Sequence, residues 1–204
     1  MTLPTTRIGK LTISRLVMGG NPVSGNSHAG AKRDAAMLDY FTASNTKALF
    51  RRCEANGINT VQMRADRHIT RLLHEYWNEG GKLQWIAQTA PECEVMQNIA
   101  EAKARGASAI YLHGGMLDAA FERGDYDSQR RQFDRIRETG LPAGVAAHYP
   151  DNLRKVRDLG WNPDFYMVCL YNIPGYRGKL SAGEDEKFVE SDRAKALPIF
   201  RELD

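Results

Sequence analysis

The chain has 204 residues, and its 28 Lys and Arg against 25 Asp and Glu give a net charge of +3. Apolar residues make up 42% and charged residues 26%, which is a globular and not a disordered composition. The small net charge argues against a nucleic-acid surface, because such surfaces need clustered lysines and arginines. We therefore expect one folded domain that does not bind nucleic acid.

Membrane and disulfide classes are also disfavoured. No apolar run approaches the roughly 18 residues needed to cross a bilayer, and Met1–Lys10 lacks the apolar core of a secretory signal. The three cysteines are odd in number, far apart and without a CxxC pair, which is typical of a reducing compartment. The sequence predicts a cytoplasmic protein with no membrane partner and leaves the oligomeric state open.

Short apolar runs alternate with helical patterns, which predicts a parallel sheet with crossover helices. A hairpin over Thr5–Ile13 precedes a strand over Arg15–Gly19 and a long loop from Gly20 to about Ala43. Five more strands are expected over Ile58–Met63, Leu83–Thr89, Ala109–Leu112, Ala143–Ala147 and Phe165–Leu170. Helices are expected over about 44–57, Arg67–Asn78, Glu94–Arg105, Asp127–Thr139, Asp151–Leu159 and Ser191–Leu203, the last broken by Pro198.

This pattern contains six βα units, each about the size of one βαβ step. The fold class predicted is α/β, a (β/α)8 TIM-barrel type truncated to six units behind an N-terminal β-hairpin. A complete barrel has roughly 250 residues, so we expect residues 1–204 to form a single partial barrel domain that lacks two C-terminal βα units. A six-stranded open sheet is the alternative.

Polar side chains gather where each predicted strand ends, and parallel strands carry function at their carboxyl ends. His113 and His148 follow two neighbouring apolar strands, and imidazole is the usual acid–base group near neutral pH. Asp66 stands where it could orient a histidine or cap the next helix. We predict these three residues to be catalytic. The predicted substrate-binding residues are Asn21, His28, Gln62, Arg64, Arg67, His68, Gln88, Tyr171 and Asn172.

Several segments give the chain a likeness to a known family. The segment Ile13–Gly20 follows the hairpin as a first barrel strand would, and Asn56–Asn59 reads as the entry to a second strand. Tyr111–His113 ends the fourth strand with a histidine, and Leu141–Tyr149 covers the fifth. In these features the chain resembles the aldo/keto reductase barrel.

The resemblance implies a TIM barrel that passes hydride from a nicotinamide to a carbonyl, with a tetrad of aspartate, tyrosine, lysine and histidine. This chain departs from that tetrad, because Gln62 replaces the aspartate, Thr89 replaces the lysine and no tyrosine follows Gln62 in the next loop. The nicotinamide-binding positions read Ala146-Ala147 and Met167. Only His113 matches the tetrad, so ordinary carbonyl reduction is not expected.

Four functions are weighed on this basis. The first is a diverged aldo/keto reductase-like enzyme that performs acid–base chemistry on a small polar carbonyl- or sugar-like substrate. The second is a metal-dependent hydrolase, isomerase or lyase, with ligands from His113, His148, His28 or Asp66. The third is a non-catalytic ligand-binding protein, and the fourth an NADP-dependent oxidoreductase. The cofactor is left open between a divalent metal and NADP, and the expected partner is a small molecule.

Overall fold

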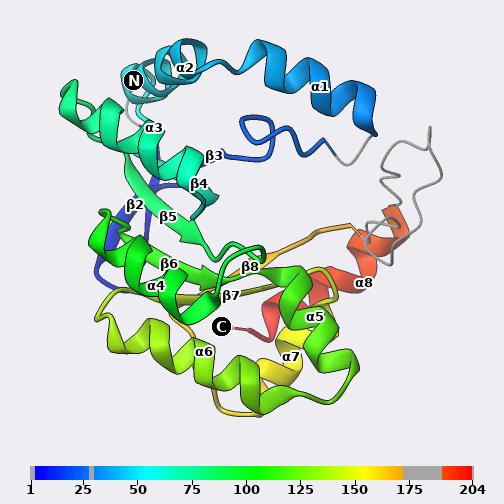
Figure 1. Cartoon of the computed structure of the whole chain (residues 1–204). Helices are drawn as coiled ribbons and strands as arrows, with labels where there is room; N and C mark the ends of the chain where they lie inside the picture. Colours follow the sequence, from blue (N-terminus) through cyan, green and yellow to red (C-terminus); the bar gives the residue numbers. More distant parts are fainter. Residues whose placement is uncertain (1–2, 28–29, 172–189, 204) are drawn as a thin grey trace.

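The structure is a computed structural model that describes residues 3–27, 30–171 and 190–203. Figure 1 shows a curled sheet with the helices around it, which is an α/β half-barrel. The strands are β1 Thr5–Ile8, β2 Leu11–Ser14, β3 Met18–Gly19, β4 Thr60–Arg64, β5 Gln84–Gln88, β6 Ala109–Leu112, β7 Ala143–Ala147 and β8 Phe165–Val168. The helices are α1 Ala31–Tyr40, α2 Ala43–Ala55, α3 Arg67–Asn78, α4 Val95–Ala104, α5 Gly114–Glu122, α6 Tyr126–Glu138, α7 Pro150–Asp158 and α8 Glu190–Arg201.

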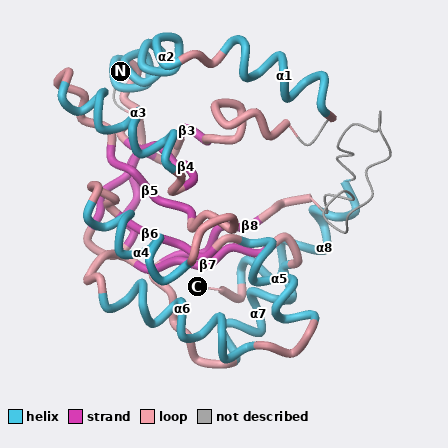
Figure 2. The backbone as a smooth tube through the Cα atoms, in the orientation of Figure 1, coloured by secondary structure: helices cyan, strands magenta, loops and turns pink. Residues whose placement is uncertain are grey.

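The predicted fold class is confirmed. Strands β3 to β8 pair in sequence order, and every pair is parallel, while β1 and β2 form the predicted antiparallel hairpin. The tube in Figure 2 shows the strands alternating with helices along the chain. Parallel pairing brings the carboxyl ends of all six strands to the same rim.

Four predictions of secondary structure are wrong. The predicted loop after β3 contains α1, in which no residue is buried, so the apolar periodicity that marks a packed helix is missing. Gly114 and Gly115 begin α5 instead of a loop, because the ring of His113 caps the first turn. The helix expected over about 44–57 is α2, which begins at Ala43 behind the cap residue Thr42 and ends at Ala55. Helix α8 continues through Pro198, and its Ala196 and Ile199 are buried.

Alternation along the strands gives the sheet two apolar faces. Trp85, Ala87, Ile110 and Leu112 belong to the large core between sheet and helices. Their neighbours form a smaller inner core, which consists of Ile13, Ile86, Ala109, Tyr111 and Ala146. A Cβ on Gly144 would come within 2.4 Å of the Phe165 ring, so only glycine leaves room for that ring in the inner core.

The N-terminal hairpin lies against the amino ends of β4 and β5. The Ser14 amide donates to Asn59 Oδ1 at 2.7 Å, and the Asn59 amide donates to Ser14 Oγ at 3.1 Å. Gln84 Nε2 donates to the Thr12 carbonyl at 2.9 Å. The hairpin therefore contacts the end of the sheet opposite to the rim where the strands finish.

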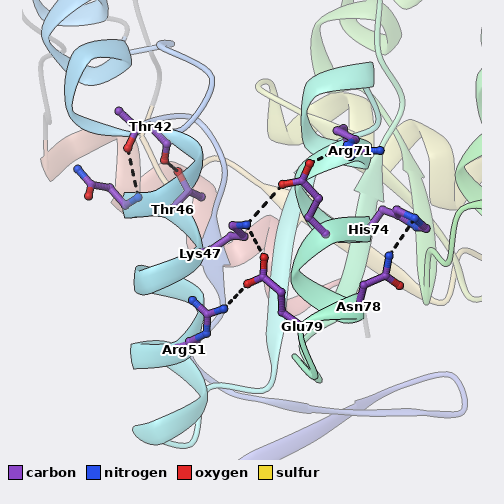
Figure 3. A network of polar contacts seen from close by, with 10 residues as sticks. Thr42, Thr46, Lys47, Arg51, Arg71, His74, Asn78 and Glu79 are labelled. Atoms are coloured by element: carbon purple, nitrogen blue, oxygen red, sulfur yellow. Dashed lines mark hydrogen bonds and ion pairs between the residues drawn. The ribbon is translucent and has the colours of Figure 1, made fainter.

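Ion pairs join α2 to α3 on the outer surface, as Figure 3 shows. Lys47 lies 3.4 Å from Glu75 and also pairs with Glu79, which in turn binds Arg51. His74 is exposed on α3 and contacts Asn78. Within the described ranges, no helix has both the length and the apolar character needed to cross a membrane.

Asn98 on α4 joins the loops that follow β4 and β5. Its Nδ2 donates to the Ala65 carbonyl at 2.7 Å, its Oδ1 accepts from the Ala90 amide at 2.9 Å, and the side chain is 4% exposed. Asn98→Ala leaves both backbone groups buried and unpaired, so we expect the free energy of unfolding to fall by about 2–4 kcal/mol. Urea denaturation measures this loss. Gln97→Ala, at the exposed neighbouring position, should stay within about 0.5 kcal/mol of the wild type.

Candidate functional site

A cavity of about 300 Å³ opens at the rim where the strands end. Six of the residues predicted for the site line it together: Asn21, Gln62, Arg64, Gln88, His113 and His148. They come from the segments after β3 and β6, the strands β4 and β5, and the turn after β7. The parallel register therefore assembles residues that are up to 127 positions apart in the chain.

His113 is held as a neutral donor. Its ring Nδ1 accepts a hydrogen bond from the Gly115 amide at 3.1 Å, at the start of α5. Its own amide donates to the hydroxyl of the buried Thr89 at 3.0 Å. Burial, the charge of Arg64 and the nearby His148 lower the pKa of His113 to about 4. Since Nδ1 accepts, the neutral ring carries its proton on Nε2.

His148 is bound to a buried carboxylate that the sequence analysis missed. Asp118 Oδ2 lies 2.8 Å from His148 Nδ1 and accepts the His148 amide at 2.8 Å, while its Oδ1 accepts Asn152 Nδ2 at 2.7 Å. Asp118 is 6% exposed, and these contacts offset the cost of burying it. A carboxylate only accepts, so the ring proton of neutral His148 lies on Nδ1 and the lone pair on Nε2.

Arg64 and Gln62 contribute polar groups on the β4 side. Arg64 Nη2 donates to Glu92, whose carboxylate is half exposed, and Gln62 Nε2 donates to the hydroxyl of Tyr111 in the inner core. Tyr111 in turn meets the Phe165 ring edge to face, with the centroids 6.0 Å apart. The floor of the cavity is thus tied to the inner core of the half-barrel.

Other predicted site residues lie elsewhere. Asp66 caps α3, where its Oδ1 accepts the Ile69 amide at 2.8 Å, and it borders a separate hollow together with Arg67. His68 is exposed on the first turn of α3, and Tyr171 borders a hollow against α8. His28 and Asn172 lie outside the described residues. The carboxylate that contacts a histidine is therefore Asp118 and not Asp66.

The residues that sequence reasoning missed have no local signal of function. Asp118 stands in the middle of α5 and Asn152 in the first turn of α7, and both occur in segments without a recognised motif. Ser24, Asn26 and Cys169 also line the cavity. Asp118 could have been noticed only if α5, the helix between the strands that precede His113 and His148, had been predicted.

The three-ligand metal site that was weighed from the sequence does not form among the described residues. No group of three or more His, Cys, Asp and Glu side chains is close enough there to hold a metal ion. His113 and His148 share the cavity, but Asp118 contacts only the second of them among the hydrogen bonds described above.

No protein-family model matches the chain, and no curated protein matches it. Among solved structures, the chain is similar to "QR15, an Aldolase", with 13% identity and a TM-score of 0.50 over 62% of this chain and 61% of that one. It is also similar to a putative deoxyribose-phosphate aldolase from Coccidioides immitis, with 18% identity and a TM-score of 0.48 over 66% of this chain and 57% of that one. This chain covers less than two thirds of each.

The resemblance to aldo/keto reductases is wrong, and so are the functions derived from it. The first aldolase structure shares the fold, and its likeness extends to the barrel architecture alone at this identity. The short strand motifs misled because any parallel barrel places small and apolar residues at strand entries and a polar residue at strand exits. Gln62 and Thr89, which stand where the reductase tetrad has an aspartate and a lysine, also argue against an aldo/keto reductase.

Gly114 provides the space that the His148 ring occupies. A Cβ at Gly114 would lie 3.0 Å from His148 Cε1 and 3.3 Å from Nδ1. We expect Gly114→Ala to displace the ring and weaken its bond to Asp118, which nuclear magnetic resonance of the Nδ1 proton would detect. In Gly19→Ala the added Cβ meets nothing within 4 Å, so the same resonance should not move. An unchanged resonance in Gly114→Ala would contradict this packing.

The lowered pKa of His113 makes stability depend on pH. The unfolded state binds a proton near pH 6.5 and the folded state only near pH 4, so protons favour unfolding in this window. We expect the free energy of unfolding to fall by up to about 3 kcal/mol as pH drops from 7 to 4 on account of this residue. His113→Gln should remove that part of the pH dependence in urea denaturation series. His74→Gln, an exposed histidine, should leave it in place.

Proposed function

We propose that this chain is an aldol-type lyase, which makes or breaks the carbon–carbon bond beside a carbonyl group through proton transfer by two histidines. The observation that carries the proposal is that the two rings at one cavity are held in opposite tautomers. His113 accepts a hydrogen bond at Nδ1 from the Gly115 amide, whereas His148 presents Nδ1 to Asp118. One histidine is thus set to donate through Nε2 and the other to accept through Nε2.

His113 is suited to polarise the substrate carbonyl. A neutral imidazole N–H at a helix N-terminus can hydrogen-bond a carbonyl oxygen and stabilise the negative charge that develops on it. The low pKa of about 4 keeps the ring neutral across the physiological range, so it acts by hydrogen bonding and not as a charged acid. The Thr89 hydroxyl and the Gly115 amide fix its backbone and ring.

His148 is suited to act as the base. Asp118 orients the imidazole and stabilises the imidazolium that forms when Nε2 takes a proton. Asn152 holds the other carboxylate oxygen, so Asp118 is fixed from two sides. The His148 side chain is 14% exposed, which leaves little water to compete for the transferred proton.

The cleavage direction balances as follows. His148 Nε2 removes the proton from the hydroxyl on the carbon β to the carbonyl, and that C–O bond becomes a carbonyl. The bond between the α and β carbons breaks, and its electron pair forms an enolate whose oxygen accepts from His113 Nε2–H. His148 then returns the proton to the α carbon, which restores the starting state of both rings.

The comparison with known structures and the cavity lining bear on the barrel fold and on how the carbonyl is activated. A solved structure that shares the fold is described as an aldolase, although the likeness speaks for the fold alone. No lysine from the described residues lines the cavity, and Lys195 borders a neighbouring hollow. Activation of the carbonyl as a Schiff base would need a lysine, so here the hydrogen bond from His113 takes that part.

Exchange of α-protons for deuterium tests this chemistry without the complete substrate. Pyruvate, dihydroxyacetone and acetaldehyde in heavy water would be followed by proton nuclear magnetic resonance with the purified full chain. We expect exchange into at least one of them, and a loss of about 10²-fold or more in His148→Asn and His113→Gln.

His74→Asn is the matched control, because it replaces a histidine on the exposed face of α3. It should exchange at the wild-type rate. Circular dichroism and the melting temperature show that each variant is folded. Wild-type rates in a folded His148→Asn variant, or no exchange above background in the wild type, would refute the proposal.

A further inference from the structure

Arg64 is the source of permanent positive charge in the cavity. It ends β4, and the other described lining residues include no Lys, Asp or Glu. The neutral His113 adds no charge near pH 7. Arg64 is therefore the one permanently charged residue in the described lining of the cavity, next to the two histidines that would carry the reaction.

The guanidinium of Arg64 is only partly satisfied. Its Nη2 pairs with Glu92, which lies on the far side toward the hollow beside α4 and is half exposed. Its Nε is buried and finds no hydrogen-bond partner among the described residues. A buried N–H of a charged group that lacks a hydrogen-bond partner lowers stability. The guanidinium edge that carries Nε is therefore a candidate for binding a ligand. A carboxylate that binds Nε and Nη2 through both its oxygens requires the Arg64 side chain to turn and expose Nε to the cavity.

We propose that Arg64 anchors the carboxylate of the substrate, which would be a small hydroxycarbonyl acid with a single negative charge. The proposal rests on the proposed function, since it names the substrate class of the same site. Glu92 then acts as an internal competitor: it holds Nη2 in this structure, and when it yields, the Arg64 side chain turns so that a substrate carboxylate takes Nε and Nη2 together. Its exposure makes this exchange cheap, because the displaced carboxylate returns to water.

A single carboxylate fits this site better than a phosphate group. One guanidinium neutralises one negative charge, and a phosphate dianion would keep a second charge in a half-enclosed cavity. The described lining offers no second permanent cation to meet it. The volume of about 300 Å³ also suits a compound of a few carbon atoms.

Binding experiments in the His148→Asn background separate this proposal from the reaction itself. The probes are pyruvate, its neutral amide pyruvamide, and inorganic phosphate, each titrated by calorimetry or by ligand-observed nuclear magnetic resonance. We expect Arg64→Gln to weaken pyruvate binding at least about tenfold and to leave pyruvamide unaffected. The pyruvate affinity of Arg64→Lys should lie between those of the wild type and Arg64→Gln, because lysine keeps the positive charge but cannot bind a carboxylate through two N–H groups of one plane.

Glu92→Gln tests the competitor and keeps Arg64 intact. We expect it to tighten pyruvate binding about two- to fivefold, as the loss of one partly exposed ion pair allows. Arg71→Gln, an exposed arginine on α3 that lies outside the site, is the matched control and should change nothing.

Pyruvate binding that is absent, or that does not depend on Arg64 in folded variants, would overturn the proposal. Phosphate bound through Arg64 more tightly than pyruvate would overturn the carboxylate assignment. These outcomes are distinct from failure of the proposed function. Arg64-dependent pyruvate binding without proton exchange in the wild type would leave the anion anchor in place and refute the lyase. Proton exchange in the wild type without Arg64-dependent binding would support the lyase and refute the anion anchor.

Discussion

Parallel pairing of β3 to β8 is the constraint on which the rest of this structure depends. Because every strand returns through a helix to run in the same direction, all six carboxyl ends meet at one rim. Residues that the chain separates widely, such as Gln62, His113 and His148, therefore line one cavity. The same constraint brings the start of α5 to that rim, where its first turn orients His113.

The burial of Asp118 is the second organising feature. A carboxylate that is almost fully buried needs hydrogen-bond donors, and the fold supplies them from the backbone and ring of His148 and from Asn152. These contacts join α5, the turn after β7 and α7 around one side chain. Burial of the Asp118 carboxylate costs stability, and packing alone does not require a carboxylate beside an imidazole. The contact with His148 gives this burial a purpose, because it orients the imidazole at the cavity.

The two histidines illustrate how surroundings give one residue type two states. His113 is desolvated and close to Arg64, so its neutral form is favoured, and a backbone amide selects its tautomer. His148 faces a carboxylate, which selects the other tautomer. Imidazoles at equivalent strand ends thus acquire different surroundings from α5, which lies against β7 and carries both the helix N-terminus and Asp118.

By itself, the sequence determined the parallel α/β architecture, the N-terminal hairpin, the strand order and most of the rim. Its apolar runs and glycine-ended helices are local signals, and β6, β7 and α3 have the bounds that those signals predict. Helix α1 was not predicted because it buries no residue, and α5 was not predicted because it begins with two glycines.

Only the tertiary structure decided the partners within the site. It placed Asp66 in a helix cap, put Asp118 against His148, continued α8 through Pro198, and showed that the reductase-like motifs were features of the barrel fold. The physical reason is that a hydrogen bond between α5 and the turn after β7, like the desolvation that lowers the pKa of His113, depends on distances between distant segments. No local pattern of residues encodes those distances.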